Sequence, residues 1–310
     1  MTKIILDCDP GIDDALAILF ALGDPDLEVM AITAVAGNRP VTQTFENARR
    51  LAALAGRSDI PVYKGAAAPL GGSMPRTNLV HGADGLGGVD LPPSQGEFLE
   101  RPAAQAIIDI LANEDENTIS LVAIGPLTNL ALAQSLSPET FARAERLAIM
   151  GGSVTIPGNV TPAAEFNFWA DPIAADQIFQ SNVEIELFGL DVTSQAICTE
   201  EWLNALARLP GPAAEPISHM IANYFAEDPL LHDPCPIAWL MKPELFTSTP
   251  MHIRIETAGP RSVGQSIGWM PERPDSPAAP NARVHTGVNA EGLLTLMYER
   301  LYSLGANSTC

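Results

Sequence analysis

The chain has 310 residues and a formal net charge of −20, with 46% hydrophobic and 17% charged residues. This much apolar sequence suffices for a sizeable core and excludes an extended disordered chain. The negative charge excludes a surface built to bind nucleic acid or anionic membranes, and no apolar run reaches the roughly 18 residues that a membrane span needs.

The four cysteines are scattered along the chain. None belongs to a CxxC pair, which argues against a zinc site, and no secretory hydrophobic segment precedes them. We therefore expect reduced thiols in a cytoplasmic protein. The cysteines are Cys8, Cys198, Cys235 and Cys310.

Short apolar runs alternate with segments of helical period up to about Leu190. The predicted strands are Lys3–Leu6, Val29–Val35, Ile60–Tyr63, Ile119–Ala123, Leu147–Met150 and Val183–Leu190. The predicted helices are Ile12–Leu22, Thr42–Ala55, Ala103–Ala112, Leu127–Ser135 and Pro172–Gln180. This alternation predicts an α/β fold, with an open, mostly parallel central sheet, helices on both faces and right-handed crossovers.

The pattern is less regular after Leu190. The predicted helices there are Glu201–Leu209, Ile217–Phe225, Pro236–Leu240 and Glu291–Leu301, and the predicted strands are Met251–Glu256 and Arg283–Val288. No internal repeat and no linker is evident. We therefore expect residues 1–310 to form a single domain.

The segment DCDPGIDD follows the first predicted strand and places four carboxylates within a few residues, those of Asp7, Asp9, Asp13 and Asp14. Ligands of open α/β sheets bind outside the carboxyl ends of the strands. Asp7 and Asp9 share a strand face if the strand extends that far. Asp13 and Asp14 fall in the first turn of a helix, whose dipole offsets only about half a charge.

Two interpretations of this cluster remain open. Helix capping and surface acidity explain one or two of the aspartates. A bound divalent cation explains all four, and oxygen ligands favour Ca²⁺ or Mg²⁺ over zinc. Flexible, bidentate coordination favours Ca²⁺, although the spacing is not that of an EF-hand loop.

Further motifs follow this cluster in order along nearly the whole chain. They are AITAVAGN ending at Asn38, HGADGLGG from His81, VAIGPLTNLA across Ile124, MGGSV from Met150, AAEFNFWADP with Glu165 and Asn167, and LHDPC with His232 and Asp233. Together with DCDPGIDDALAI they resemble the nucleoside hydrolases, the inosine-uridine preferring N-ribohydrolases. The resemblance implies Ca²⁺-dependent hydrolysis of the N-glycosidic bond of ribonucleosides, giving ribose and free nucleobase for purine and pyrimidine salvage. It also implies a homodimer or homotetramer whose partner is a small-molecule nucleoside.

The resemblance assigns roles to individual residues. Ca²⁺ would be held by the carboxylates of Asp9, Asp14 and Asp233 and by the backbone carbonyl of Ile124. Asp9 would act as general base on a water molecule and His232 as the acid for the leaving base, and inversion is expected because no covalent intermediate is needed. The residues expected to bind substrate are Asp13, Asn38, His81, Met150, Asn159, Glu165 and Asn167.

The stretch MIANYFAEDPLLHDP before Asp233 departs from the family pattern. Several relatives carry a longer segment here, with aromatic or basic side chains that close over the base. Tyr224 and Phe225 are partial substitutes in this chain, so the preferred nucleobase stays open.

Two other functions compete with nucleoside hydrolysis. A non-catalytic nucleoside-binding protein would share the fold, but both the expected base and the expected acid are present. A haloacid-dehalogenase-like phosphatase would use Asp7 as nucleophile with Mg²⁺, but it leaves Asp13 and Asp14 without a role. A P-loop enzyme is excluded, because the sequence contains no GxxxxGK[ST].

Overall fold

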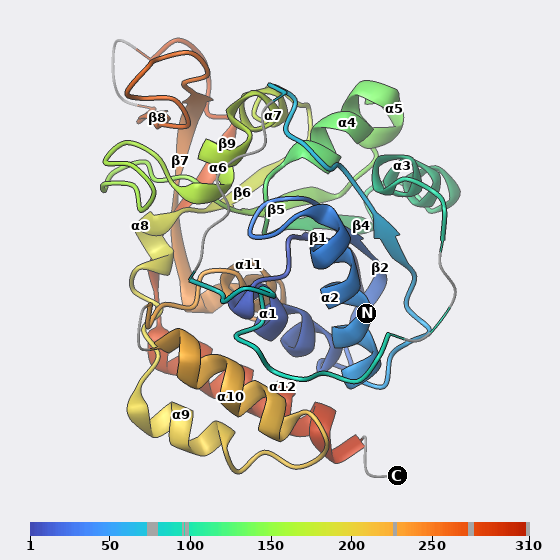
Figure 1. Ribbon diagram of the computed structural model, residues 1–310. Helices are drawn as coiled ribbons and strands as arrows, with labels where there is room; N and C mark the ends of the chain where they lie inside the picture. Colours follow the sequence, from blue (N-terminus) through green and yellow to red (C-terminus); the bar gives the residue numbers. More distant parts are fainter. Residues whose placement is uncertain (73–79, 95, 97–98, 226–227, 272–275, 308–310) are drawn as a thin grey trace.

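The computed structural model describes residues 1–72, 80–94, 96, 99–225, 228–271 and 276–307, and within them nine strands form one sheet (Figure 1). The order is β3-β2-β1-β4-β5-β6-β9-β7-β8. The strands are β1 (Thr2–Cys8), β2 (Leu27–Ala34), β3 (Val62–Lys64), β4 (Ile119–Ala123), β5 (Arg146–Met150), β6 (Ile185–Phe188), β7 (Phe246–Ile255), β8 (Ser266–Trp269) and β9 (Ala282–Val288). Strand β7 is antiparallel to both of its neighbours, and the other pairs are parallel. The prediction of a mostly parallel sheet is confirmed.

Helices cover both faces of this sheet, as predicted (Figure 1). One face carries α1 (Ile12–Leu22), α2 (Val41–Leu54), α8 (Leu190–Thr193), α9 (Glu200–Leu206), α10 (Ala214–Phe225), α11 (Pro234–Met241) and α12 (Ala290–Asn307). The other carries α3 (Ala103–Asn113), α4 (Thr128–Leu136), α5 (Pro138–Phe141) and α7 (Pro172–Ile178), and the short α6 (Phe166–Ala170) precedes α7. A 3₁₀ turn, η1 (Pro243–Leu245), leads into β7.

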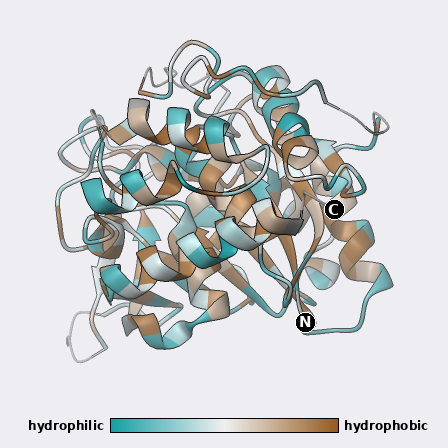
Figure 2. Ribbon diagram, turned by 90° about the horizontal axis from the view of Figure 1, so that it is seen from below, coloured by the Kyte–Doolittle hydropathy of each residue, from teal (hydrophilic) through white to brown (hydrophobic). Residues whose placement is uncertain are grey.

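Strand β1 shows why two cores form. Ile4 and Leu6 pack into the core under α1, whereas Ile5 packs into the opposite core, because successive side chains of a strand point to opposite faces. Hydrophobic and hydrophilic residues alternate in short blocks along the helices, as expected for helices with one face on a sheet (Figure 2). Among the described residues, no helix is both long and apolar enough to cross a bilayer.

Most predicted elements agree with the structure to within a few residues, but β7 begins five residues before the predicted strand, at Phe246, and α12 ends six residues after the predicted helix, at Asn307. The strand predicted to reach Leu190 ends at Phe188, because Gly189 caps the four-residue helix α8. Helices α5, α6 and α8 and strand β8 were not predicted, since four or five residues are too few to show a period. Strand β1 ends at Cys8, so Asp9 lies just beyond it, and the face shared with Asp7 does not form.

The strand order places a topological switch point between β1 and β4. The chain leaves β1 toward β2 and β3 on one side, while β4, β5 and β6 extend the sheet on the other. Ligands of open α/β sheets bind in the crevice at such a point. Asp9 follows β1 and Ile124 follows β4, so both predicted residues lie at this crevice.

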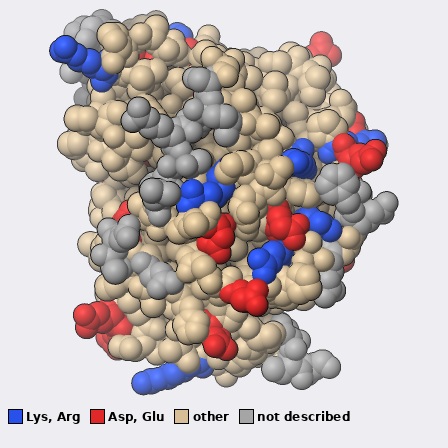
Figure 3. Space-filling model, viewed as in Figure 1, with Lys and Arg blue, Asp and Glu red and all other residues tan. Residues whose placement is uncertain are grey.

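Three cysteines, Cys8, Cys198 and Cys235, are buried free thiols, and Cys310 lies outside the described residues. Arg and Lys side chains lie scattered among Asp and Glu on the face of the molecule that Figure 3 shows.

Candidate active site

A pocket of about 470 Å³ opens at the switch point. Of the site residues predicted from the sequence, all except Asp9 and Asp14 line it, and these two lie beneath it with 1% and 0% of their surface exposed. The lining residues that were predicted are Asp13, Asn38, His81, Ile124, Met150, Asn159, Glu165, Asn167, His232 and Asp233.

Asp9 is fixed by the backbone around it. Its Oδ2 accepts a hydrogen bond from the Asn38 amide at 2.5 Å, and its own amide donates to Asp14 Oδ1 at 3.0 Å. A Cβ atom at Gly37 or Gly125 would lie 2.1 or 2.4 Å from the carboxylate oxygens, so only glycine lets the chain pass so close. Oδ1 of Asp9 is buried and has no hydrogen-bond partner among the described residues.

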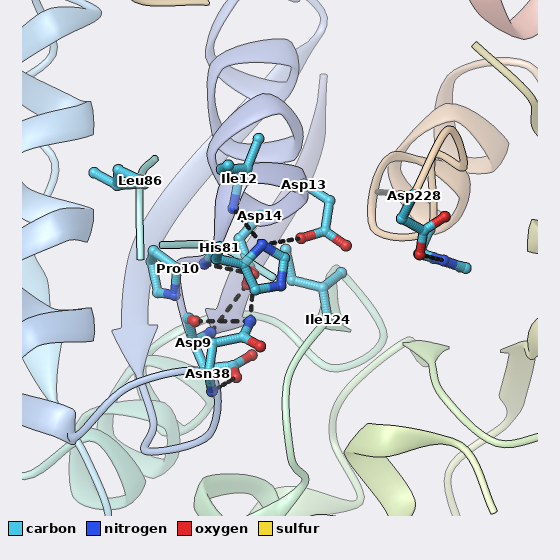
Figure 4. Close-up of polar contacts among 12 residues, drawn as sticks. Asp9, Pro10, Ile12, Asp13, Asp14, Asn38, His81, Leu86, Ile124 and Asp228 are labelled. Atoms are coloured by element: carbon cyan, nitrogen blue, oxygen red, sulfur yellow. Dashed lines mark hydrogen bonds and ion pairs between the residues drawn. The ribbon is translucent and has the colours of Figure 1, made fainter. Parts of the chain in front are cut away.

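Three further carboxylates lie beside Asp9, and Figure 4 shows two of them, Asp13 and Asp14. Asp13, Asp14 and Asp233 each offer an oxygen, and these oxygens lie within 4.8 Å of one another. Asp14 Oδ2 also accepts from the Gly11 amide at 2.9 Å, which closes the first turn of α1. Residues from two distant parts of the chain therefore meet at one point, as the resemblance implies.

The electrostatic cost of this cluster is visible in its pKa values. Burial, and then the charge of Asp13, raise the pKa of Asp14 to about 7. Burial, and then the charge of Asp14, raise the pKa of Asp9 well above its usual value, and burial together with the charges of Asp13 and Asp14 does the same for Asp233. Such a cluster favours either protonation or a bound cation.

The donor set fits a hard dication. All of the converging groups are oxygens, and Asp9 Oδ1 and Asp13 Oδ1 are buried without a hydrogen-bond partner in the described part of the chain. Asp13, which the resemblance assigned to ribose, stands as close to Asp14 and Asp233 as a ligand would. The Ile124 carbonyl accepts from Asn167 Nδ2 at 3.0 Å, and a carbonyl oxygen has a second lone pair for a cation.

Asp7 has a separate environment, although it belongs to the same sequence cluster. Its Oδ1 accepts from Thr33 Oγ1 at 2.5 Å and from Asn129 Nδ2 at 2.7 Å. These contacts join β1, β2 and α4 beneath the pocket. Asp7 does not line the pocket, which removes the nucleophile that a phosphatase would need.

The wall of the pocket where the resemblance places the ribose is built from strand ends and α6. Glu165 caps α6 and accepts from the Asn167 amide at 2.8 Å and from the Gly152 amide at 2.7 Å; burial raises its pKa despite these bonds. Asn167 Nδ2 also donates to the Met150 carbonyl at 3.2 Å. Asn159 Oδ1 accepts from the Phe166 amide at 3.0 Å, which leaves its Nδ2 to donate into the pocket.

An aromatic pair forms part of the opposite wall. The His81 ring stacks on Tyr224, with centroids 5.5 Å apart and an interplanar angle of 12°. The Ile12 amide donates to His81 Nδ1 at 3.1 Å, so Nδ1 is the unprotonated nitrogen and Nε2 carries the hydrogen. Burial lowers the pKa of His81, which favours this neutral form. Tyr224 was anticipated as a partial substitute for the missing aromatic segment.

His232 is held from both sides. Its Nδ1 lies 2.7 Å from Thr193 Oγ1, and its Nε2 lies 3.4 Å from Asp228 Oδ2. Burial opposes protonation, but the hydrogen bond to Asp228 and the charge of Asp13 outweigh it, and the pKa of His232 is raised. The ring is therefore placed to give a proton to a group in the pocket, and its raised pKa favours the protonated form.

The sequence analysis missed Asp228 and Thr193. Asp228 lies four residues before His232, but in a loop this spacing does not predict that the two side chains are close. Thr193 lies in the short helix that follows β6. Ligands bind beyond the carboxyl ends of such strands, so this position could have marked Thr193 as a site residue.

Comparison with known proteins gives similar results by sequence and by structure. Residues 4–295 match the family model described as inosine-uridine preferring nucleoside hydrolase. The chain is 40% identical to the pyrimidine-specific ribonucleoside hydrolase RihA of Shewanella oneidensis, over 96% of this chain and 95% of that one.

Solved structures agree. A purine-preferring ribonucleoside hydrolase from Gardnerella vaginalis superposes with a TM-score of 0.91 at 31% identity and full coverage of both chains. The plant nucleoside hydrolase PpNRh1 gives 0.88 at 34% identity, over 97% of this chain and 99% of that one.

Proposed function

The chain belongs to the inosine-uridine preferring nucleoside hydrolase family, and from this premise we propose that it hydrolyses ribonucleosides with Ca²⁺ as its metal, Asp9 as general base and His232 as general acid. As a family member it is a hydrolase acting on N-glycosyl compounds. The observation that carries the residue assignments is the convergence of Asp13, Asp14 and Asp233 at a pocket that His232 also lines, with Asp9 buried beside them.

The metal-binding proposal rests on the oxygen donors of the cluster. Asp14, Asp233, the Ile124 carbonyl and either Asp9 or Asp13 would hold the ion. When bound, Ca²⁺ supplies a Lewis acid that neutralises the carboxylates, orients water and ribose hydroxyls, and makes that water more acidic. We propose Ca²⁺ over Mg²⁺ because buried, bidentate carboxylates suit its larger and more flexible coordination shell.

Asp9 would remove the proton from the attacking water. Oδ2 is held by the Asn38 amide, so the free Oδ1 is the oxygen that accepts the proton. Fixed geometry of this kind makes general base catalysis effective. No side chain is needed as a covalent partner, and inversion at the anomeric carbon follows.

The charge of the pocket favours the transition state. Departure of the base places positive charge on the ribose ring. Asp13 and Glu165 line the pocket, and carboxylates that are fixed there before the bond breaks would stabilise that charge. Asn159 and Asn167 would hold the ribose hydroxyls, and the sugar thereby stays aligned with Asp9.

On the base side, His232 would donate its Nε2 proton to the leaving nucleobase. His232 Nε2 lies 3.4 Å from Asp228 Oδ2, a long contact that a base nitrogen can replace. Tyr224 and His81 form an aromatic wall on which a planar base can stack. We take pyrimidine ribonucleosides as the first substrates to test, because RihA of Shewanella oneidensis is described as pyrimidine-specific.

We propose that residues 1–310 act as one domain, since the pocket draws residues from Asp13 to Asp233 and β9 lies within the same sheet. A homodimer or homotetramer, a cytoplasmic location and a role in nucleobase salvage are further proposals. They rest on the family and on the buried free thiols.

The test is a panel of ribonucleosides, deoxyribonucleosides and ribosyl-nicotinamide, assayed for release of ribose and free base. We expect turnover of ribonucleosides by wild type, a large loss in Asp9→Asn, and wild-type rates in Asp24→Asn. Asp24 is a suitable control because it is a buried carboxylate far from the pocket, bonded to Arg300 Nε at 2.5 Å. Nucleoside binding without turnover would support the non-catalytic alternative instead, and phosphate release from a phosphomonoester would support the phosphatase.

A further inference from the structure

Two chain segments run side by side as they leave the sheet next to the pocket. One leaves β5 at Gly151, and the other leaves β6 at Gly189 (Figure 1). The Gly151 amide donates to the Phe188 carbonyl at 3.3 Å, and the Leu190 amide donates to the Gly152 carbonyl at 2.9 Å. The second segment continues into the short helix α8.

Asp191, in the first turn of α8, holds the first segment in place. The residue is 5% exposed. Its Oδ2 accepts from the Val154 amide at 2.8 Å, and its Oδ1 accepts from the Thr155 amide at 2.6 Å and from Thr155 Oγ1 at 2.5 Å. Three donors from two consecutive residues fix the point at which the loop 155–163 begins.

The segment that leaves β5 contacts one sugar-side residue near its start and carries another farther along. The Gly152 amide donates to Glu165 Oε2 at 2.7 Å. Farther along, the loop brings Asn159 to the pocket wall. Asn159 is exposed, and outside the loop its side chain is held by the hydrogen bond from the Phe166 amide at 3.0 Å. Asp191 does not line the pocket.

Asp191 is therefore placed to act on the substrate through the loop alone. We propose that Asp191 is a positioning residue for the sugar side of the active site: it anchors the segment that aligns Asn159 and supports Glu165. This inference rests on the proposed function, because it assumes that the sugar binds beside these two residues.

The same helix offers an internal contrast. Thr193, two residues after Asp191, holds the base-side imidazole of His232 at 2.7 Å. A defect that spreads along α8 would impair proton donation to the leaving base. A defect confined to the loop would impair the sugar side and affect good and poor leaving groups equally.

Asp191→Asn is the informative change, because it keeps the shape and removes the charge. The asparagine side chain has an NH₂ group where aspartate has a second oxygen. At least one of the three donors that now bind the carboxylate would therefore face another donor. We expect kcat/KM to fall at least about tenfold, which corresponds to about 1.4 kcal/mol, with the same fold loss for uridine and for a nitrophenyl riboside. Asn159→Ala should add little to this loss, because residues that act through one another are not additive.

The experiment compares wild type, Asp191→Asn, Asn159→Ala, the double variant and Asp24→Asn with both substrates. Equal losses for the two substrates and a non-additive double variant support the inference. A loss confined to uridine, additive effects, or an equal loss in Asp24→Asn overturns it.

Hydrogen exchange of the amides separates this inference from the proposed function. In Asp191→Asn the amides of Val154 and Thr155 and of the loop 155–163 should lose protection, while those of β1 and β4 keep it. Wild-type protection in the loop overturns the inference, whatever the activity. If wild type releases no base from any nucleoside, the proposed function fails, and the exchange result still decides whether Asp191 anchors the loop.

Discussion

Without a bound metal, the stability of this protein should fall as pH rises from 5 to 8, which most proteins do not show over this range. Asp14 has a pKa of about 7 in the folded chain without a cation, and an unfolded aspartate titrates near 3.9. The folded state therefore binds more protons between these values, and stability falls as pH rises through about 7. Asp9 and Asp233 are shifted in the same direction.

The size of the effect follows from the shift. Between pH 5 and a folded pKa of about 7, about two pH units at about 1.4 kcal/mol each give about 3 kcal/mol for Asp14. In a chain of this size this corresponds to a change in Tm on the order of 5 °C between pH 5 and pH 8. A saturating cation should restore a similar amount at pH 8, since a ligand at a thousand times its Kd contributes about 4 kcal/mol.

The assay is thermal unfolding of metal-stripped protein at pH 5 to 8, with and without CaCl₂ or MgCl₂. We expect Tm to fall with pH in the stripped protein and to recover with Ca²⁺ at pH 8 but little at pH 5. In Asp233→Asn the stripped protein should be more stable than wild type at pH 8 and should lose its response to Ca²⁺. Asp24→Asn should keep both the pH slope and the response.

Three results would contradict this reasoning. The first is a Tm of the stripped protein that stays constant from pH 5 to 8. The second is a Ca²⁺ response that persists in Asp233→Asn. The third is a Tm of stripped Asp233→Asn that lies below that of stripped wild type at pH 8. Stronger stabilisation by Mg²⁺ than by Ca²⁺ would leave the cluster as a metal site and overturn the choice of cation.

Further changes test the chemistry. Asp9→Asn should lower kcat by about 10³-fold in single-turnover release of base, and a loss below tenfold would remove Asp9 as general base. His232→Ala should slow uridine far more than a nitrophenyl riboside, whose leaving group needs no proton; equal losses would refute the assignment of the acid. Tyr224→Ala removes the ring stacked on His81 and should lower kcat/KM for nucleosides about tenfold. Tyr224→Phe should recover most of this loss, and a Tyr224→Phe variant as slow as Tyr224→Ala would show that the hydroxyl matters rather than the ring.

The sequence predicted the centre of the site better than its walls, and the reason is local. Asp9, Asp13 and Asp14 lie within one turn of chain after a strand, and Gly11 forces them together by capping α1. Their convergence needs only a strand, a turn and a helix. Asp233 is distant in sequence, and only the resemblance to a family connects it with this cluster.

The walls of the pocket could not be predicted from local sequence, because the packing of distant elements determines which residues form them. Asp228 and Thr193 flank His232 from a loop and from a four-residue helix, and neither element has a sequence period. The bonds that Asp191 makes depend on two neighbouring strands ending level with each other. Strand register is set by the whole sheet, so no local motif marks Asp191 as an anchor.

The two walls of the pocket are built from different parts of the fold, so substitutions in the wall proposed for the base can leave the proposed sugar site unchanged. The residues proposed to bind the sugar come from the ends of β1, β2, β4 and β5, whose spacing the hydrogen-bonded ladder fixes, and from α6 and the loop before it. The base side comes from α10 and the loop after it, which carry Tyr224, Asp228 and His232 and pair with no central strand. Substitutions there leave the sheet register unchanged. A pyrimidine-specific relative at 40% identity and a purine-preferring one with a TM-score of 0.91 are therefore compatible with a single fold and a single arrangement of carboxylates.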